Sequence, residues 1–110
     1  MSKQSDLSEQ INHDFSEVTD LLVALGDKKR LEILSKLITA YHQEPLCVKD
    51  LTELTNLSRP AVSHHLKILK DAGIINYTKQ GTQSYYYIDN VQSNIDKMQH
   101  LTNDLLKITC

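Results

Sequence analysis

The chain has 110 residues, a formal net charge of −2 and an apolar content of 40%. This length suits one ordinary globular domain with a single small core, so we assign residues 1–110 to one domain. No apolar run approaches the roughly 18 residues of a membrane span, and the N-terminus lacks the pattern of a secretory leader. Two cysteines are too few for a secreted disulfide framework. We therefore expect a cytoplasmic protein that does not enter a membrane.

Catalytic patterns are absent from the sequence. It contains no glycine-rich phosphate loop, no paired acidic motif, and no serine or cysteine at a nucleophile elbow. We therefore expect neither enzymatic activity nor a cofactor.

The first predicted element is an amphipathic helix over about residues 6–25. Its apolar stripe repeats at helical spacing through Leu7, Ile11, Phe15, Val18, Leu22 and Leu25. Gly26 is predicted to close this helix, and Asp27 to cap a second helix of about residues 28–41. The expected core face of the second helix is formed by Leu31, Leu34, Leu37 and Ile38.

Residues 47–72 have the pattern of a helix-turn-helix. The first helix, ending near Thr55, would turn Val48, Leu51 and Leu54 inward, with Leu57 filling the turn. Ser58 suits the N-cap of the second helix, and Pro60 is tolerated in its first turn. Val62, Leu66 and Leu69 form the inward face of this helix, and Gly73 is expected to end it with a left-handed cap.

The outer face of that second helix is basic and hydroxylic. Ser63 and His64 lie where short polar groups reach base edges, and the lysines are suited to phosphates. A merely solvated face is the alternative interpretation. We expect His65 to be a structural hydrogen-bonding residue. The predicted DNA-contacting residues, including two from the following loop, are Arg59, Pro60, Ser63, His64, Lys67, Lys70, Lys79 and Gln80.

A two-stranded β-hairpin is predicted over residues 74–89. The strands, Ile74–Thr78 and Tyr85–Asp89, are rich in β-branched and aromatic residues, and residues 79–84 form the polar loop between them. Tyr86 and Ile88 face one side of their strand and Tyr85 and Tyr87 the other, so one of the two sets belongs to the core. The predicted fold is therefore mainly α, a winged helix-turn-helix with about five helices and a hairpin wing.

Charge is divided unevenly along the chain. Residues 58–81 carry four cations against one acid, whereas residues 1–27 carry one cation against six acids. Counterion release depends on the local patch that meets phosphate, so the predicted reading helix and wing suit DNA despite the negative total.

The end of the chain predicts another amphipathic helix, over about residues 91–108. Its apolar stripe is Val91, Ile95, Met98, Leu101, Leu105 and Ile108. One subunit cannot easily bury both terminal stripes, so we expect a homodimer through the helices of residues 6–25 and 91–108. A two-fold axis would place two reading helices in successive major grooves of double-stranded DNA.

The segments Leu22–Leu37, Leu46–Leu51, Leu57–Gly73 and Gln80–Ile88 resemble the ArsR/SmtB family of bacterial winged-helix repressors. The resemblance covers about residues 20–90, and the Ser-His-His-Leu-Lys run at residues 63–67 is its most specific part. It implies a homodimeric repressor with five helices and two strands. It also implies an imperfect palindromic operator and release by a metal ion or another small signal.

The family's two common metal sites are altered in this sequence. The Cys-x-Cys pattern is reduced to Cys47-Val48-Lys49, and the C-terminal ligand positions hold Asn90, Gln92, Asn103 and Leu106. These are poor zinc ligands, so we expect no metal site. A metal-responsive repressor with a non-standard site, using His13 or His100, is one alternative.

Cys47 and Cys110 are candidate thiol sensors. A helix N-terminus favours thiolate at Cys47, although a small buried hydrophobe is the commoner role of a single cysteine. Lys28, Lys29 and Arg30 indicate either a phosphate contact or plain surface charge. A winged helix used only for protein–protein interaction is the remaining alternative.

Overall fold

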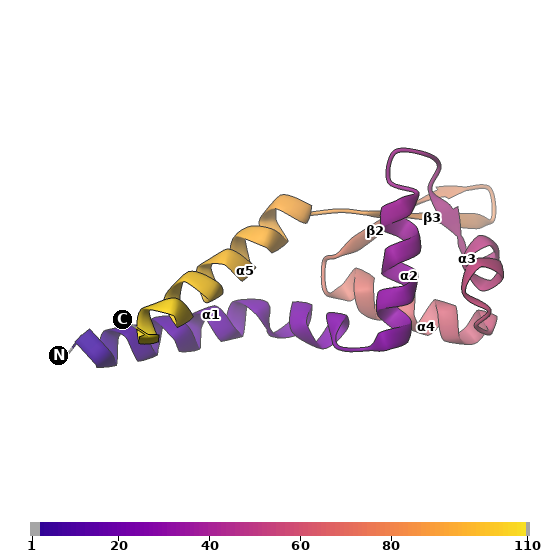
Figure 1. The fold of residues 1–110 in the computed structure, drawn as a ribbon. Helices are drawn as coiled ribbons and strands as arrows, with labels where there is room; N and C mark the ends of the chain where they lie inside the picture. The colour runs from indigo at the N-terminus through magenta and orange to yellow at the C-terminus, as the bar shows by residue number, and fades with distance from the viewer. Residues whose placement is uncertain (1–2, 110) are drawn as a thin grey trace.

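The computed structural model describes residues 3–109 and divides into an elongated arm and a head (Figure 1). The arm consists of α1 (Lys3–Leu25) and α5 (Val91–Leu106), followed by the short 3-10 helix η1 (Lys107–Thr109). The head holds the remaining elements. The molecule measures 57 × 23 × 20 Å, because the two helices of the arm extend away from the head.

The two arm helices pack on each other through one face of each. Ile11 and Val18 of α1 and Leu101 of α5 are buried. The C-terminal end of α5 lies close to α1, and α5 diverges from α1 toward the head (Figure 1). The predicted terminal helices therefore exist, and part of each apolar stripe is covered within the subunit.

The head is built on three helices: α2 (Lys28–Thr39), α3 (Val48–Thr55) and α4 (Arg59–Asp71). Their buried side chains form a single core with residues that follow α4. The largest fully buried members of this core are Ile33, Leu37, Leu51, Val62, Leu66, Leu69 and Ile75. Val62, Leu66 and Leu69 are the predicted inward face of α4, and this prediction is confirmed.

Local capping accounts for the helix boundaries. The Asp27 carboxylate accepts a hydrogen bond from the Arg30 backbone N–H at 2.9 Å, and this bond lowers the pKa of Asp27. At the end of α4, Gly73 has a φ of +78°, and the Gly73 and Ile74 N–H groups donate to the Lys70 and Leu69 carbonyls. This pattern is a Schellman cap, and it confirms the predicted left-handed end of α4.

The sheet has three antiparallel strands rather than the two expected. β1 (Leu46–Cys47), β2 (Ile75–Gln80) and β3 (Gln83–Ile88) lie in the order β1-β3-β2. β1 pairs with Tyr85 and Tyr86 of β3. A two-residue strand has no periodicity of its own, so only its partner in the fold makes it a strand.

The predicted six-residue loop at 79–84 is wrong. The strands continue until Gln80 faces Gln83, which leaves a turn of only Gly81 and Thr82. Gly81 has a φ of +66°, as the first central position of a type II′ turn requires. Tyr86 and Ile88 pack against the core, which decides between the two faces of this strand.

Several predicted core residues lie outside instead. Leu31 and Ile38 of α2 are exposed, as is Leu54 of α3. Phe15 and Leu22, from the stripe of α1 that the sequence assigns to the dimer interface, are also exposed in the single subunit. The buried faces are rotated relative to the prediction, and include Leu21, Ala24 and Ile33. Apolar spacing defines a stripe on a helix, but neighbouring helices decide which part of a wide stripe they cover. No helix among residues 3–109 is both long and apolar enough to cross a bilayer.

Candidate nucleic-acid interface

Helix α4 is fixed at both ends and along its inner face. Ser58 caps it by accepting the Ala61 N–H at 3.2 Å, and Pro60 occupies its first turn. Because Val62, Leu66 and Leu69 are buried, the opposite side of the helix is held toward solvent. The exposed residues of this outer face are Arg59, Pro60, Ser63, His64, Lys67 and Lys70, which we call the reading face.

The cations of the reading face differ in their surroundings. The Lys67 Nζ lies 3.1 Å from an Asp71 carboxylate oxygen, one helical turn away. The Lys70 Nζ lies 5.5 Å from the centre of the Tyr77 ring, a cation–π contact that joins α4 to β2 of the wing. Both side chains keep access to solvent, so either can exchange its contact for a phosphate.

The wing places two further predicted residues at its tip. Lys79 and Gln80 are exposed at the end of β2, next to the tight turn at Gly81. The sequence predicts a loop at these positions, whereas the ladder of β2 and β3 holds them in register with Ser84 and Gln83. A paired strand fixes their position relative to α4 more firmly than a six-residue loop would.

His65 and Arg30 connect α4 to the junction of α1 and α2. The His65 Nδ1 lies 3.3 Å from an Arg30 guanidinium nitrogen. Arg30 is only 9% exposed, and its guanidinium donates to the carbonyls of Ala24 at 2.7 Å and Val23 at 3.2 Å. Burial lowers the pKa of His65 and so favours the neutral ring.

These contacts resolve two sequence-based interpretations. His65 is a structural hydrogen-bonding residue, as expected. Arg30 is buried and donates to two carbonyls at the end of α1, which favours a structural role over a phosphate contact. Lys28 and Lys29 remain exposed.

A further link joins the end of α4 to the start of α5. The Gly73 carbonyl accepts hydrogen bonds from the side-chain amides of Asn90 at 3.0 Å and Asn94 at 3.1 Å. Asn90 has a φ of +57°, in the left-handed region that asparagine tolerates better than most residues. In the sequence, Asn90 stands out only as a lost metal ligand. Asparagine adopts positive φ more readily than most residues, and this property could have indicated a turn at Asn90.

Cys47 lies at the N-cap position of α3 and is buried. Its thiol donates to an Asp50 carboxylate oxygen at 3.2 Å, and its backbone N–H donates to the same oxygen at 3.1 Å. A carboxylate neighbour differs from the cationic surroundings typical of reactive cysteines. Cys110, the other candidate thiol, lies outside the described residues.

The histidines considered as metal ligands, His13 and His100, do not belong to a group of metal-binding side chains among residues 3–109. His13 is exposed and lies 3.8 Å from a Glu17 carboxylate oxygen, and His100 is exposed on α5. Within the described part of the chain, no three His, Cys, Asp or Glu side chains are grouped to hold a metal ion.

A capped, outward-facing second helix followed by a β-hairpin defines a winged helix-turn-helix, a class of DNA-binding fold. The profile of the bacterial regulatory protein arsR family matches residues 27–77. The chain is 34% identical over 85 residues to the cadmium resistance transcriptional regulatory protein CadC of Listeria innocua, covering 77% of this chain and 69% of that protein. It belongs to the arsR family of transcriptional regulators.

Two further comparisons agree with this assignment. The arsenical resistance operon repressor of Bacillus subtilis is 42% identical over 71 residues, which cover 64% of this chain and 65% of that protein. The structure of reduced HlyU from Vibrio cholerae matches with a TM-score of 0.68 at 25% identity, covering 83% of this chain and 92% of that chain.

Proposed function

We propose that this protein is a homodimeric repressor that places two copies of α4 in successive major grooves of an imperfect palindromic operator. The observation that carries the proposal is the reading face. The core holds one side of α4, so that a basic and hydroxylic surface faces away from the subunit. The relatives are named as regulators or repressors of resistance genes, which supports the same role.

Ser63 and His64 are assigned to base edges. They are exposed in the N-terminal half of α4, the part of a recognition helix that usually enters the groove. Arg59, Lys67, Lys70 and Lys79 are assigned to phosphates, because their long cationic side chains surround that segment on α4 and the wing. Pro60 and Gln80 complete the proposed contact surface.

The experiment measures binding to a labelled duplex taken from the DNA flanking the coding region, with a scrambled duplex beside it, at several salt concentrations. Replacing Ser63 and His64 together with alanine should cost about 1–3 kcal/mol per lost base contact for the specific duplex only. The matched control replaces Asn12 and His13, an exposed polar pair on α1, and should bind as the parent does. Equal affinity of the Ser63/His64 variant and the parent would remove these residues from the interface.

Chemical modification of the Cys47 thiol is a candidate mechanism for releasing the repressor from its operator. Cys47 is buried but is among the residues that line a cavity of about 590 Å³ beside α3 and β3, which brings a small reagent close to this residue. The relatives named for cadmium and arsenical resistance point instead to metals. Lys49 now stands where the family pattern would place a second thiolate, and this favours the thiol route over a metal.

A further inference from the structure

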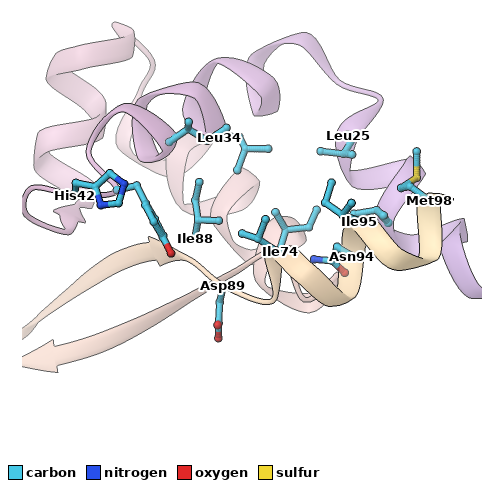
Figure 2. Close-up of a pocket in the computed structure, with 13 residues that line it drawn as sticks. Leu25, Leu34, His42, Ile74, Ile88, Asp89, Asn94, Ile95 and Met98 are labelled. Carbon is cyan, nitrogen blue, oxygen red and sulfur yellow. The ribbon is translucent and has the colours of Figure 1, made fainter.

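A cavity of about 620 Å³ lies where the arm meets the head (Figure 2). Its walls come from α1, α2, α5 and the segments that flank the wing, and include Leu25, Leu34, Ile74, Ile88, Ile95 and Met98. Sites for small molecules typically have volumes of about 300–1,000 Å³ and mostly apolar walls with a few polar groups. This cavity has both properties.

The charges around the cavity select the kind of ligand. No lysine or arginine among residues 3–109 lines it. Asp89 directs its carboxylate away from the cavity (Figure 2), and its two oxygens accept hydrogen bonds from the Asn90 N–H and the Asn76 amide. A charged ligand would lose its hydration without gaining an opposite charge, so the walls favour a neutral molecule.

Two hydrogen-bonding side chains, those of Tyr41 and His42, belong to the cavity walls. His42 lies at the end of the cavity opposite Met98 (Figure 2), and its ring stacks edge-on against Tyr41 with centroids 4.8 Å apart. An imidazole and a phenol there can orient one polar group of an otherwise apolar ligand.

A second copy of the chain is the other conceivable occupant. The arm, however, exposes apolar residues that lie outside the cavity walls, among them Phe15, Leu22 and Leu105. A dimer surface is therefore available on the arm without filling the cavity, which favours a small molecule as its occupant.

The position of the cavity connects an occupant to the reading face. Ile74 directly follows the Gly73 cap of α4, and Ile88 ends the wing. Asn94 lines the cavity and also donates to the Gly73 carbonyl at 3.1 Å. A bound molecule would thus touch groups that fix the orientation of α4 relative to α5.

We propose that this cavity binds a neutral, largely apolar small molecule with one hydrogen-bonding group, and that the bound molecule alters operator affinity by changing the orientation of α4 relative to the arm. The proposed effect on operator affinity rests on the proposed function as a DNA-binding repressor. A ligand shifts an equilibrium only through different affinities for its two states, and such coupling typically changes affinity about 5- to 150-fold.

The test uses the full chain and the neutral fluorescent probe N-phenyl-1-naphthylamine. Its fluorescence should rise on binding the parent, and saturating probe should weaken operator binding by about 5-fold or more. Ile38→Glu places a carboxylate at the rim of the cavity and should abolish the fluorescence rise. Leu31→Glu makes the same change two turns away on the exposed side of α2, outside the cavity, and should leave probe binding unchanged.

Four results would overturn the proposal. Absence of binding, or equal loss in both variants, would remove the cavity as a ligand site. If the probe is displaced when the protein concentration is raised across the range in which dimers form, the cavity would be assigned to the second copy. Binding with unchanged operator affinity would remove the regulatory role. Operator binding by the parent without probe tests the proposed function separately, so the two failures are distinguishable.

Discussion

Two aspartates occupy the packed face between α1 and α5. Asp14 and Asp104 are both buried, and Lys107 donates to Asp104 at 2.9 Å. The Asp14 Oδ2 has no hydrogen-bond donor among the described residues. A side-chain hydrogen bond with Asp104, which requires a proton between the two carboxyls, raises the pKa of Asp14, and burial adds to this effect. The same bond and Lys107 lower the pKa of Asp104.

The raised pKa of Asp14 predicts that stability falls as pH rises above the unfolded pKa near 4 and through the folded pKa. Between these two pKa values the unfolded chain has released the proton while the folded chain still holds it. Asp104 has the opposite effect, because its pKa is lowered in the folded state. Its contribution to stability is lost only as pH falls below its unfolded pKa near 4. Asp14→Asn keeps a donor toward Asp104 without a titrating proton, so it should be more stable than the parent at neutral pH and lack the decline.

Urea unfolding at several pH values measures this difference. Asp20→Asn, an exposed change on the same helix, is the control and should retain the parent's pH dependence. A decline that persists in Asp14→Asn would show that another group carries the proton.

Zinc should leave operator affinity unchanged, because Lys49, Asn90 and Gln92 replace residues that could bind it. Any loss of operator binding after peroxide or a persulfide donor should disappear in Cys47→Ser. Operator titrations of the parent and this variant, with each reagent in turn, measure both effects. Loss of binding with zinc in the serine variant would instead implicate His13, His42 or His100.

At the scale of elements, the end of α4 depends on backbone conformation rather than on packing. A Cβ built at Gly73 meets no atom within 4 Å, yet the φ of +78° is unfavourable for most residues. Gly73→Ala should therefore destabilise the fold by about 1–2 kcal/mol. Gly73→Asn should cost less, because asparagine tolerates this region. Chemical denaturation measures both variants, and equal losses would show that steric contact, not conformation, sets the cost.

The sequence was sufficient for elements that are specified locally. The caps at Asp27, Ser58 and Gly73 follow from single residue types at fixed offsets, and the inward face of α4 follows from its spacing. Features that depend on distant neighbours were missed. β1 exists only because β3 lies beside it, Arg30 is buried because the end of α1 lies over it, and the bonds to the Gly73 carbonyl join residues 17 and 21 positions apart.

At the scale of the whole molecule, exposed apolar residues on the arm predict the proposed dimer. Phe15 is 44% exposed and Leu105 is 37% exposed, and an aspartate at either position would be buried in a dimer. Phe15→Asp and Leu105→Asp should yield folded monomers by light scattering and circular dichroism. Val18→Asp should unfold the subunit, because Val18 is 0% exposed.

The control for dimerisation is Leu54→Asp. Leu54 is 50% exposed but lies on α3, in the head, so this variant should remain dimeric. A parent that is monomeric at micromolar concentration would contradict the two-groove arrangement.

The separation of charge along this elongated molecule bears on how it approaches DNA. The acidic residues of the first 27 positions belong mainly to the arm, and the excess cations of residues 58–81 lie on α4 and the wing. With the ends of a 57 Å body so charged, the subunit is an electric dipole, and the field of a duplex exerts a torque that turns the head toward it. The torque acts within a Debye length of about 8 Å at physiological salt, so it orients the protein during the final approach. The acidic arm thereby disfavours encounters in the wrong orientation before any base is read.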